Sequence, residues 1–329
     1  MVLYYPRNCL LTQQRTNGIT ECPLPPGYSK TYRFLATQHG TSWYHSHYSA
    51  QYGDGVLGPI VIYGPATANY DIDLGAMPIS DFYYQSAYVE ALLAAEQGPP
   101  TADNGLINGK MVNPSGTAGA YNQVTLQRGK TYRLRLINTS MDNHFKVSLD
   151  SHNLTVIAAD FVPIVPYNTS WLFIGIGERY DVIITASQPI GNYWFRAEVQ
   201  QGCGSNANNG NIKAIFHYQG AATSNPNSTA TSYTQSCLDE TDLVPYVAKD
   251  VPEDQFVYPE AEELTIGGPS IVDGLFIWNV NGSGIDVDWE MPTLQYVYEG
   301  NTSYPSDLNI YQLPKANAVG HALFSLKIC

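Results

Sequence analysis

The sequence predicts an all-β protein built from several β-sandwich domains. Its 329 residues include 25 tyrosines, 28 glycines and 21 prolines, a composition that favours strands joined by many turns over long helices. Short strand candidates follow one another at regular spacing, which is typical of sandwiches and barrels. Hydrophobic residues make up 44% of the chain, enough for two or three domains with cores of their own.

Two strands are predicted in the first 66 residues. In residues 31–36, Tyr32 and Phe34 alternate with polar side chains, which predicts a half-buried strand. Residues 56–63 form a nearly continuous apolar run bounded by glycines, which predicts a buried strand. These two strands would be the last part of a sandwich domain.

The next elements are one helix and a long series of strands. Residues 86–97 predict the clearest helix, which ends at Gly98-Pro99-Pro100. Residues 221–260 are rich in Ser, Thr, Asn, Pro and acidic side chains and predict a surface linker. The strands predicted after the helix cover residues 123–126, 131–137, 145–149, 154–158, 170–175, 180–186, 193–199, 212–218, 263–266, 275–280 and 293–298.

Charge and hydropathy exclude two classes of partner. The chain carries 16 basic and 29 acidic side chains, for a formal net charge of −13. Because phosphate binding depends on Lys and Arg, this balance argues against nucleic acid and anionic membranes. No apolar stretch of about 18 residues occurs, so no membrane span is expected.

The centre of the functional prediction is the pair His45 and His47. The flanks of this segment resemble β-strand, and residues two apart on a strand point to the same face. Two imidazoles on one face can hold one metal ion or two adjacent ions, and imidazole suits copper, zinc, iron and nickel. The spacing alone does not distinguish such a site from two ordinary histidines at a strand end.

The residues around these histidines resemble a motif of a known family. The run Gly-Thr-Ser-Trp-Tyr-His-Ser-His at residues 40–47 resembles a copper motif of the fungal laccases, multicopper oxidases of which the ascomycete type is most similar. The resemblance extends over roughly residues 16–310. It continues through residues 51–53, 55–60, 71–75, 106–109, 137–140, 143–145, 177–182 and 300–305.

The resemblance implies cupredoxin-like Greek-key sandwich domains, one complete and two partial. Residues 1–66 would be the C-terminal part of a first domain and residues 67–220 a complete second domain. After the linker 221–260, residues 261–329 would begin a third domain, with an aberrant tail from about residue 307. By this comparison we expect the chain to be truncated at both ends, without a signal peptide, although the family is secreted.

The resemblance also implies a copper site that this sequence supplies only in part. Such oxidases are expected to use four His-rich motifs, the last carrying a His-Cys-His. Only His45 and His47 form a His-x-His here, and no cysteine has a histidine beside it, so we expect no type 1 copper site. By resemblance, His45 and His47 each ligate one copper of the type 3 pair. Of the remaining histidines, His144 and His152 are expected to be structural, and His39 to lie at the surface or behind the ligands.

Asp142 is the candidate residue on the substrate side. In the family, a carboxylate at this position lies beside the phenolic substrate and takes its proton as an electron leaves, which is chemically reasonable because an oxidised phenol is far more acidic. A solvated turn aspartate is the alternative, since Met-Asp-Asn suits a turn. Dioxygen would be the electron acceptor of the intact enzyme.

Cysteines and sequons point to the secretory pathway. By resemblance Cys203 and Cys237 form a disulfide, while the family partner of Cys22 is absent, and Cys9 and Cys329 lie in segments that do not align. Asn-x-Ser/Thr sequons are glycosylation candidates in a secreted protein, although chance could produce them in a chain rich in these residues. They occur at Asn138, Asn153, Asn168, Asn227, Asn281 and Asn301.

Three functions fit these observations. The first is an inactive fragment of a secreted laccase, which lacks three of the four copper motifs. The second is a genuine non-catalytic paralogue that serves as a cupredoxin-like binding or scaffold protein. The third is a ferroxidase-type multicopper oxidase, which the ascomycete-like motifs disfavour.

Overall fold

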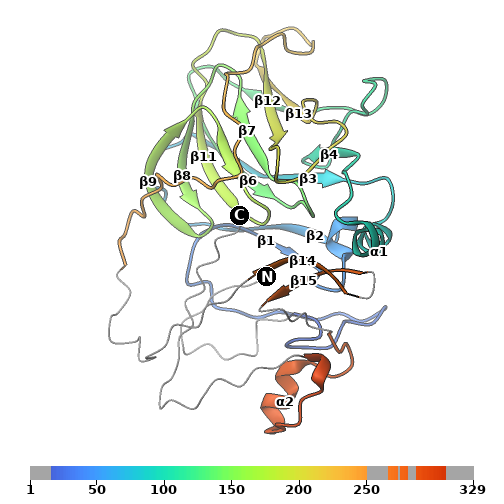
Figure 1. Ribbon diagram of the computed structural model, residues 1–329. Helices are drawn as coiled ribbons and strands as arrows, with labels where there is room; N and C mark the ends of the chain where they lie inside the picture. Colours follow the sequence, from blue (N-terminus) through green and yellow to red (C-terminus); the bar gives the residue numbers. More distant parts are fainter. Residues whose placement is uncertain (1–15, 250–265, 273–274, 281–286, 309–329) are drawn as a thin grey trace.

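A sandwich of two β-sheets forms the centre of the molecule (Figure 1). The structure is a computed structural model that describes residues 16–249, 266–272, 275–280 and 287–308, with the backbone alone for 266–280. One sheet has six strands in the order β4-β3-β6-β11-β8-β9, and the other has five in the order β10-β7-β12-β13-β5. The strands are β3 (Ile72–Phe82), β4 (Asn104–Ile107), β5 (Asn122–Leu126), β6 (Thr131–Asn138), β7 (Phe145–Leu149), β8 (Leu154–Ala159), β9 (Val162–Thr169), β10 (Leu172–Ile174), β11 (Arg179–Thr185), β12 (Asn192–Val199) and β13 (Lys213–Tyr218).

The hydrophobic core lies between these two sheets. On β6, Tyr132, Leu134 and Leu136 all point inward and are buried, as their alternation predicts. The five-stranded sheet contributes large aromatic side chains to this core, among them Phe195 and Phe216, whose ring centroids are 5.6 Å apart. Burying each such side chain stabilises the fold by about 1.5–3 kcal/mol. The predicted all-β class is confirmed.

The strand predictions for the sandwich agree with the structure within two residues at most ends, but β3, β4 and β9 were not predicted. β3 contains Gly75 and Pro78, which are ordinarily signals of a turn. In the structure Gly75 has φ 78° and lies at a bulge, where the register of β3 against β6 shifts. The bulge accommodates Gly75 within β3, so the strand continues past a residue that usually indicates a turn.

A two-stranded hairpin lies at one end of the sandwich. β1 (Gly40–His45) pairs antiparallel with β2 (Leu57–Ile62), and between them lies η1 (Gln51–Asp54), a 3-10 turn. The strand predicted at residues 31–36 is wrong: these residues have no regular structure, and Tyr32 and Phe34 are exposed. Alternation assigns side chains to faces, but a strand also needs a neighbour for its backbone groups, and no described strand pairs with this segment.

Buried charged groups fasten β1 to the six-stranded sheet. The Arg135 guanidinium contacts the Asp181 carboxylate at 3.0 Å and donates to the Thr41 hydroxyl at 2.9 Å. The Thr41 hydroxyl in turn donates to Asp181 at 2.5 Å, and Arg133 completes the cluster with a second ion pair to Asp181. All four side chains are at most 3% exposed. Because Thr41 belongs to β1, this cluster determines where the strand bearing His45 lies.

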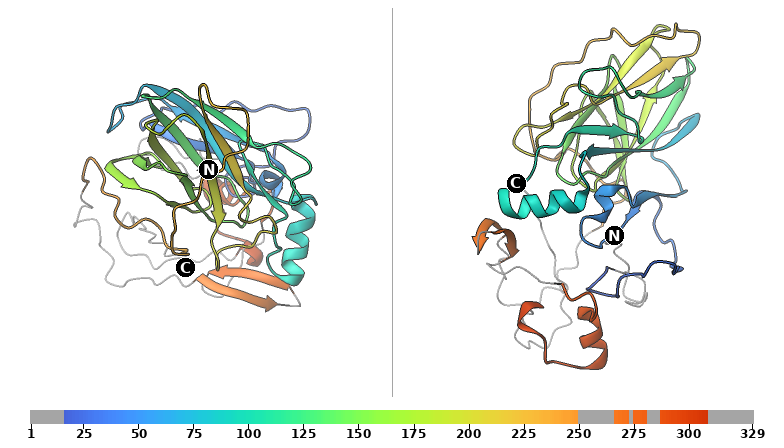
Figure 2. Two further views of the ribbon diagram at one scale, coloured as in Figure 1. Left: turned by 90° about the horizontal axis from the view of Figure 1, so that it is seen from above. Right: turned by 90° about the vertical axis from the view of Figure 1, so that its right-hand side faces the viewer.

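The two helices lie outside the sandwich. α1 (Ala87–Gln97) begins after Ser86, whose hydroxyl accepts the Val89 N–H, and it ends at Gly98 as predicted. It lies beside the hairpin of β14 (Ile266–Val272) and β15 (Leu275–Val280) (Figures 1 and 2). The short 3-10 turn η3 (Ser306–Leu308) is the last described element.

The strand predicted at residues 293–298 is wrong, because this segment is the helix α2 (Thr293–Glu299). Pro292 precedes it, and Gly300, with φ 66°, terminates it. Proline near a helix start and glycine just past its end are helix signals, but a short apolar run does not distinguish a helix from a strand. Of the strand predicted at 263–266, only the last residue lies within the described part.

The segment after β13 runs along the sandwich without regular structure up to residue 249. Its carbonyl at Thr231 accepts the indole N–H of Trp171 at 2.8 Å, and the Glu240 carboxylate accepts the Phe173 N–H at 2.9 Å. The segment therefore caps the edge strand β10 and covers one of its unpaired backbone groups.

We predict that Asp181→Ala destabilises the fold by about 3–5 kcal/mol, because it leaves two buried guanidinium groups without their shared partner. The measurement is urea unfolding followed by tryptophan fluorescence. Lys130→Ala is the control, since its ion pair with Asp71 is about 40% exposed on both sides and is expected to contribute less than about 1 kcal/mol. Equal losses in the two variants would contradict the prediction.

Candidate functional site

The predicted histidine pair comes together at the end of β1. His45 is the last residue of this strand, while His47 lies beyond it in the following loop, so only one of the two is on the strand. The two imidazole rings nevertheless lie next to each other, with centroids 4.4 Å apart and planes tilted by 34°. Trp43, two residues earlier on the same face of β1, stacks on His45 with a centroid separation of 4.1 Å. The indole thus limits the orientations open to the first imidazole.

Both histidines line a pocket of about 350 Å³. Tyr52 from η1 meets the His45 ring edge-on at 5.2 Å between centroids. The loop between β10 and β11 supplies the opposite wall through Ile176 and Gly177. The pocket therefore lies between the hairpin and the sandwich, and both are needed to form it.

The protonation states of the pair suit metal binding. The Nδ1 atom of His45 lies 3.1 Å from the Ser46 carbonyl oxygen, so it carries the proton and leaves the Nε2 lone pair available. Burial lowers the pKa of His45, and burial is also the main reason why the pKa of His47 falls to about 4. Both rings are therefore neutral at pH 7, the form in which imidazole binds a metal.

Two nitrogen donors fit part of a copper site. Within the described part of the chain, no group of three His, Cys, Asp or Glu side chains converges on a point where a metal ion could bind. Imidazole is a good ligand for copper, but a stable site depends on ligand number, geometry and supporting contacts together. His45 and His47 by themselves would provide two ligands to such a site.

Asp142 lies in the loop between β6 and β7. It is half-buried, and its carboxylate accepts a hydrogen bond from the backbone of Ser205 and a long one, 3.4 Å, from the Asn143 amide. Burial raises the pKa of Asp142, so it is a stronger base than a solvated aspartate. This environment differs from the exposed turn that was the alternative interpretation.

Two buried polar residues that the sequence did not reveal hold this loop. The Asp81 carboxylate, at the end of β3, accepts backbone N–H groups from residues 141, 142 and 143. The Asn138 amide donates to the carbonyl oxygens of Asn143 and Ile174 at 3.0 and 3.1 Å. No sequence pattern identifies Asp81, because its partners lie some 60 positions away along the chain.

The disulfide expected from the family resemblance is present. Cys203 and Cys237 are bonded, with their Cα atoms 5.9 Å apart. They join the segment after β12 to the strap, the name used here for the segment after β13, up to residue 249, that covers β10. The Cys203 carbonyl accepts the His144 N–H, so the bridge lies close to the loop that carries Asp142. Cys22 is an exposed free thiol, whereas Cys9 and Cys329 lie outside the described residues.

The sequon at Asn138 is incompatible with glycosylation of the folded protein. Its side chain is 0% exposed, and its amide is used in the two hydrogen bonds just described, so a glycan could be attached only by breaking the loop. Asn153, Asn168 and Asn227 are exposed, and Asn301 is half-buried. Asn281 lies outside the described residues.

The other described histidines have packing roles. The His152 ring is buried between the Asp150 carbonyl oxygen and the Tyr218 hydroxyl, at 2.8 and 2.7 Å. His144 stacks on Phe173 at 5.9 Å between ring centroids. Both agree with the structural role expected from the sequence. The half-buried His39 has an Nε2 atom without a hydrogen-bond partner.

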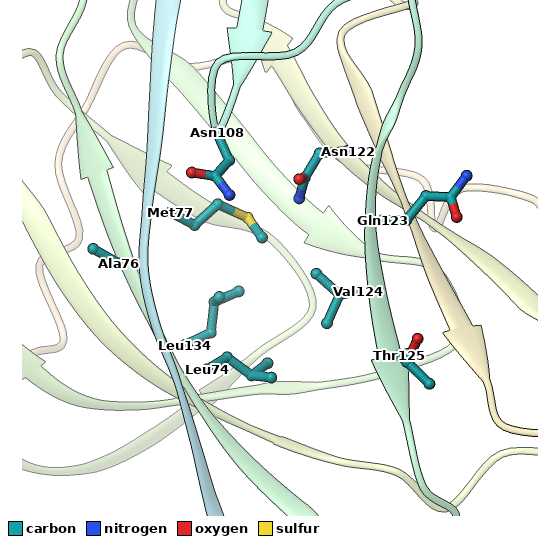
Figure 3. A pocket seen from close by; sticks show the side chains of 9 residues that line it. All are labelled: Leu74, Ala76, Met77, Asn108, Asn122, Gln123, Val124, Thr125 and Leu134. Carbon is teal, nitrogen blue, oxygen red and sulfur yellow. The ribbon is translucent and has the colours of Figure 1, made fainter.

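A second pocket, of about 260 Å³, opens between β3 and β5. Figure 3 shows the amide groups of Asn108 and Asn122 on either side of the Met77 sulfur. Its lining contains no charged side chain and none of the predicted site residues. It is therefore separate from the histidine pocket.

Two sequence profiles match the chain. Both are described as multicopper oxidase, and they cover residues 11–67 and 75–221. Laccase-3 of Botryotinia fuckeliana is 58% identical over 93% of this chain and 68% of its own length. A laccase of Neurospora crassa is 48% identical over 93% of this chain and 49% of its own length. The chain thus spans between half and about two thirds of the length of these relatives.

Solved structures show the same likeness. The laccase from Botrytis aclada aligns with a TM-score of 0.83 at 39% identity, covering 89% of this chain and 55% of that one. Fet3p, a multicopper oxidase that functions in iron import, aligns with a TM-score of 0.67 over 86% of this chain and 53% of that one; at 22% identity this shows the fold alone. The expected cupredoxin-like fold is confirmed by these neighbours.

Glu178, in the loop that lines the histidine pocket, generates a prediction about pH. Burial is the main reason why the pKa of Glu178 rises to about 7, and its carboxylate accepts the Gly175 N–H. Because the folded state binds this proton more tightly than the unfolded state, stability is greatest below the unfolded pKa of about 4.5 and falls as the pH rises towards 7. We expect Glu178→Gln to be more stable than wild type by about 3 kcal/mol at pH 8, and by little at pH 4.

The measurement is urea unfolding of both proteins at pH 4 and pH 8. Glu96→Gln, which changes an exposed glutamate of α1, is the control and should match wild type at both values. A constant difference between Glu178→Gln and wild type across this range would refute the assigned effect of burial.

Proposed function

This chain belongs to the fungal laccases of the multicopper oxidase family, and we propose that its residues contribute to the one-electron oxidation of phenols coupled to reduction of dioxygen to water. The observation that carries this proposal is the histidine pair: two neutral imidazoles 4.4 Å apart, in a pocket walled by Trp43 and Tyr52. The family uses copper, and imidazole nitrogens are among its preferred ligands.

We assign His45 and His47 as ligands of the type 3 copper pair, one to each ion. Copper held there would supply redox chemistry, through which electrons taken from the phenolic substrate would pass to dioxygen. The chain's own contribution is to hold the two rings: the Ser46 carbonyl orients His45, Trp43 packs against its face, and Tyr52 restricts access of water on its edge.

We assign Asp142 as the proton acceptor for the phenolic hydroxyl. Loss of an electron makes a phenol strongly acidic, and a carboxylate of raised pKa in a partly buried loop is suited to receive the proton. Its hydrogen bond from the Ser205 backbone leaves further carboxylate lone pairs available. The four substrate molecules that the complete reaction oxidises would each release one proton.

We propose that the 329-residue chain by itself does not catalyse the oxidation of phenols. The sequence contains one His-x-His and no cysteine beside a histidine, so neither a type 1 site nor a full ligand set for the other coppers can be assembled from it. A fragment of an active laccase and a non-catalytic paralogue share this expectation. Iron oxidation gains no specific support, because the likeness to the iron-import enzyme extends to the fold alone.

We further propose that the protein is secreted. The disulfide between Cys203 and Cys237 favours an oxidising compartment. The exposed sequons at Asn153, Asn168 and Asn227 could accept glycans there. No described helix is long and apolar enough to cross a membrane.

Copper titration tests the assignment of the ligands. The purified, dialysed chain is expected to retain little copper, because two ligands hold the metal weakly. Added Cu²⁺ should nevertheless broaden the NMR signals of His45 and His47 before those of other histidines. The double variant His45→Ala, His47→Ala should lower the apparent affinity at least about tenfold.

His217→Ala is the matched control, since His217 is a half-buried strand residue bonded to Asn192 and distant from the pair in sequence. It should bind copper as wild type does. Equal loss of affinity in the control would overturn the ligand assignment, and a blue protein that oxidises phenols would overturn the expectation that the chain does not turn over.

A further inference from the structure

The carboxylate of Asp81 is the anchor of the loop that carries Asp142. One of its oxygens accepts the Met141 N–H at 2.9 Å, and the other accepts the N–H groups of Asp142 and Asn143 at 2.7 and 3.0 Å. Asp81 is only 8% exposed. Three consecutive amide donors aimed at one carboxylate form an anion-binding concavity of the backbone, which here is filled by a side chain of the protein itself.

The main chain on either side closes the same unit. The Asp81 N–H donates to the Ser140 hydroxyl at 3.0 Å, and the Thr139 N–H donates to the Ile79 carbonyl oxygen at 2.8 Å. The end of β3 and the loop after β6 are therefore bonded through both backbone and side chains. Rotation of the loop would break several of these hydrogen bonds at once.

We propose that Asp81 is a positioning residue, which fixes the backbone of residues 141–143 so that the Asp142 carboxylate faces the substrate side in one orientation. This inference rests on the proposed function of Asp142. Asp81 does not itself touch substrate: its oxygens are occupied by the three amide donors, and its place is behind the loop. Burial is the main reason why the pKa of Asp81 is raised, and the nearby charge of Asp142 raises it further.

The same loop also reaches η1, the turn that contributes Tyr52 to the histidine pocket. A Cβ atom added to Gly53 would lie 2.0 Å from the Met141 sulfur, so Met141 occupies the space beside η1 that only glycine leaves open. η1 carries Tyr52, which packs against His45. By holding Met141 and Asp142 together, Asp81 sets the spacing between the substrate loop and the turn beside the proposed copper ligands.

Several titratable groups surround this unit and bear on its test. Tyr83, just beyond β3, and Tyr52, from η1, face it, and Glu90 of α1 lies near Tyr83. His144 faces Asp142 from the same loop, and Asp239 of the strap lies near His144. Any change in the titration of Asp142 must therefore be compared with a variant that leaves all of these groups in place.

The experiment is NMR of the full chain labelled with ¹³C at the Asp side-chain carboxyl carbon and with ¹⁵N on the backbone. The variant is Asp81→Asn, which keeps the volume but replaces two charged acceptor oxygens with one neutral one. Hydrogen exchange at Met141, Asp142 and Asn143 should accelerate at least about tenfold. The pKa of Asp142 should fall towards its ordinary value, because burial is what raises it and a less tightly held loop exposes the carboxylate to water.

Asp103→Asn is the matched control. Asp103 accepts one backbone N–H, from Tyr84, just beyond the same strand, and touches none of the residues 141–143. It should leave the exchange of these three amides and the pKa of Asp142 unchanged. If Asp81→Asn also leaves both unchanged, the positioning role is overturned.

A measurement on the wild-type chain covers the case in which Asp81→Asn does not fold. As the pH is lowered, the amide proton signals of residues 141–143 should shift together, with the midpoint at which the Asp81 carboxyl carbon titrates. Amide signals that do not follow Asp81 would equally overturn the proposal. Neither readout depends on copper or on turnover.

Addition of 2,6-dimethoxyphenol separates this inference from the proposed function. If the phenol shifts the carboxyl signal of Asp142 in wild type and less in Asp81→Asn, positioning and function both hold. If it shifts nothing in either protein while the exchange and pKa effects of Asp81→Asn are present, Asp81 still positions the loop, and the assignment of Asp142 as proton acceptor fails.

Discussion

The cluster of Arg133, Arg135, Asp181 and Thr41 is the constraint on which the site depends. Burying a carboxylate and two guanidinium groups is costly unless each finds partners, and here the carboxylate is shared by both arginines and by a hydroxyl from another strand. The hairpin can be moved from the sheet only by exposing or unpairing these charges. Charge pairing therefore fixes the position of the hairpin with more directional precision than apolar packing alone would.

The consequence is that the histidine pocket is formed by contact between two parts of the chain. Thr41 anchors β1, β1 places His45, and the loop between β10 and β11 supplies Gly177 on the opposite wall. The loop is itself bonded back to β6, since the Gly177 N–H donates to the Asn138 carbonyl oxygen at 2.9 Å. Asn138 also holds the loop with Asp142, so both proposed functional regions are built from the end of one strand.

Local signals predicted much of the sandwich. Alternation identified β6, and the stop at Gly98 identified the end of α1. The failures have physical causes. β3 was not predicted, because it contains Gly75 and Pro78 and the bulge that accommodates Gly75 is a tertiary arrangement. Residues 293–298 were predicted as a strand because so short an apolar run suits either period.

The sequence by itself determined the all-β class and the family, and it supplied the candidate site residues: His45, His47, Asp142 and the cysteine pair all lie in recognisable motifs. Only the tertiary structure decided how they are held. Asp81 is an ordinary residue until folding brings it to a loop some 60 positions away. Asn138 likewise changes from an apparent sequon into a buried amide when its side chain bonds the carbonyl oxygens of Asn143 and Ile174. Hydrogen bonds between distant segments leave no periodic trace in a sequence, because they depend on which surfaces the core brings together.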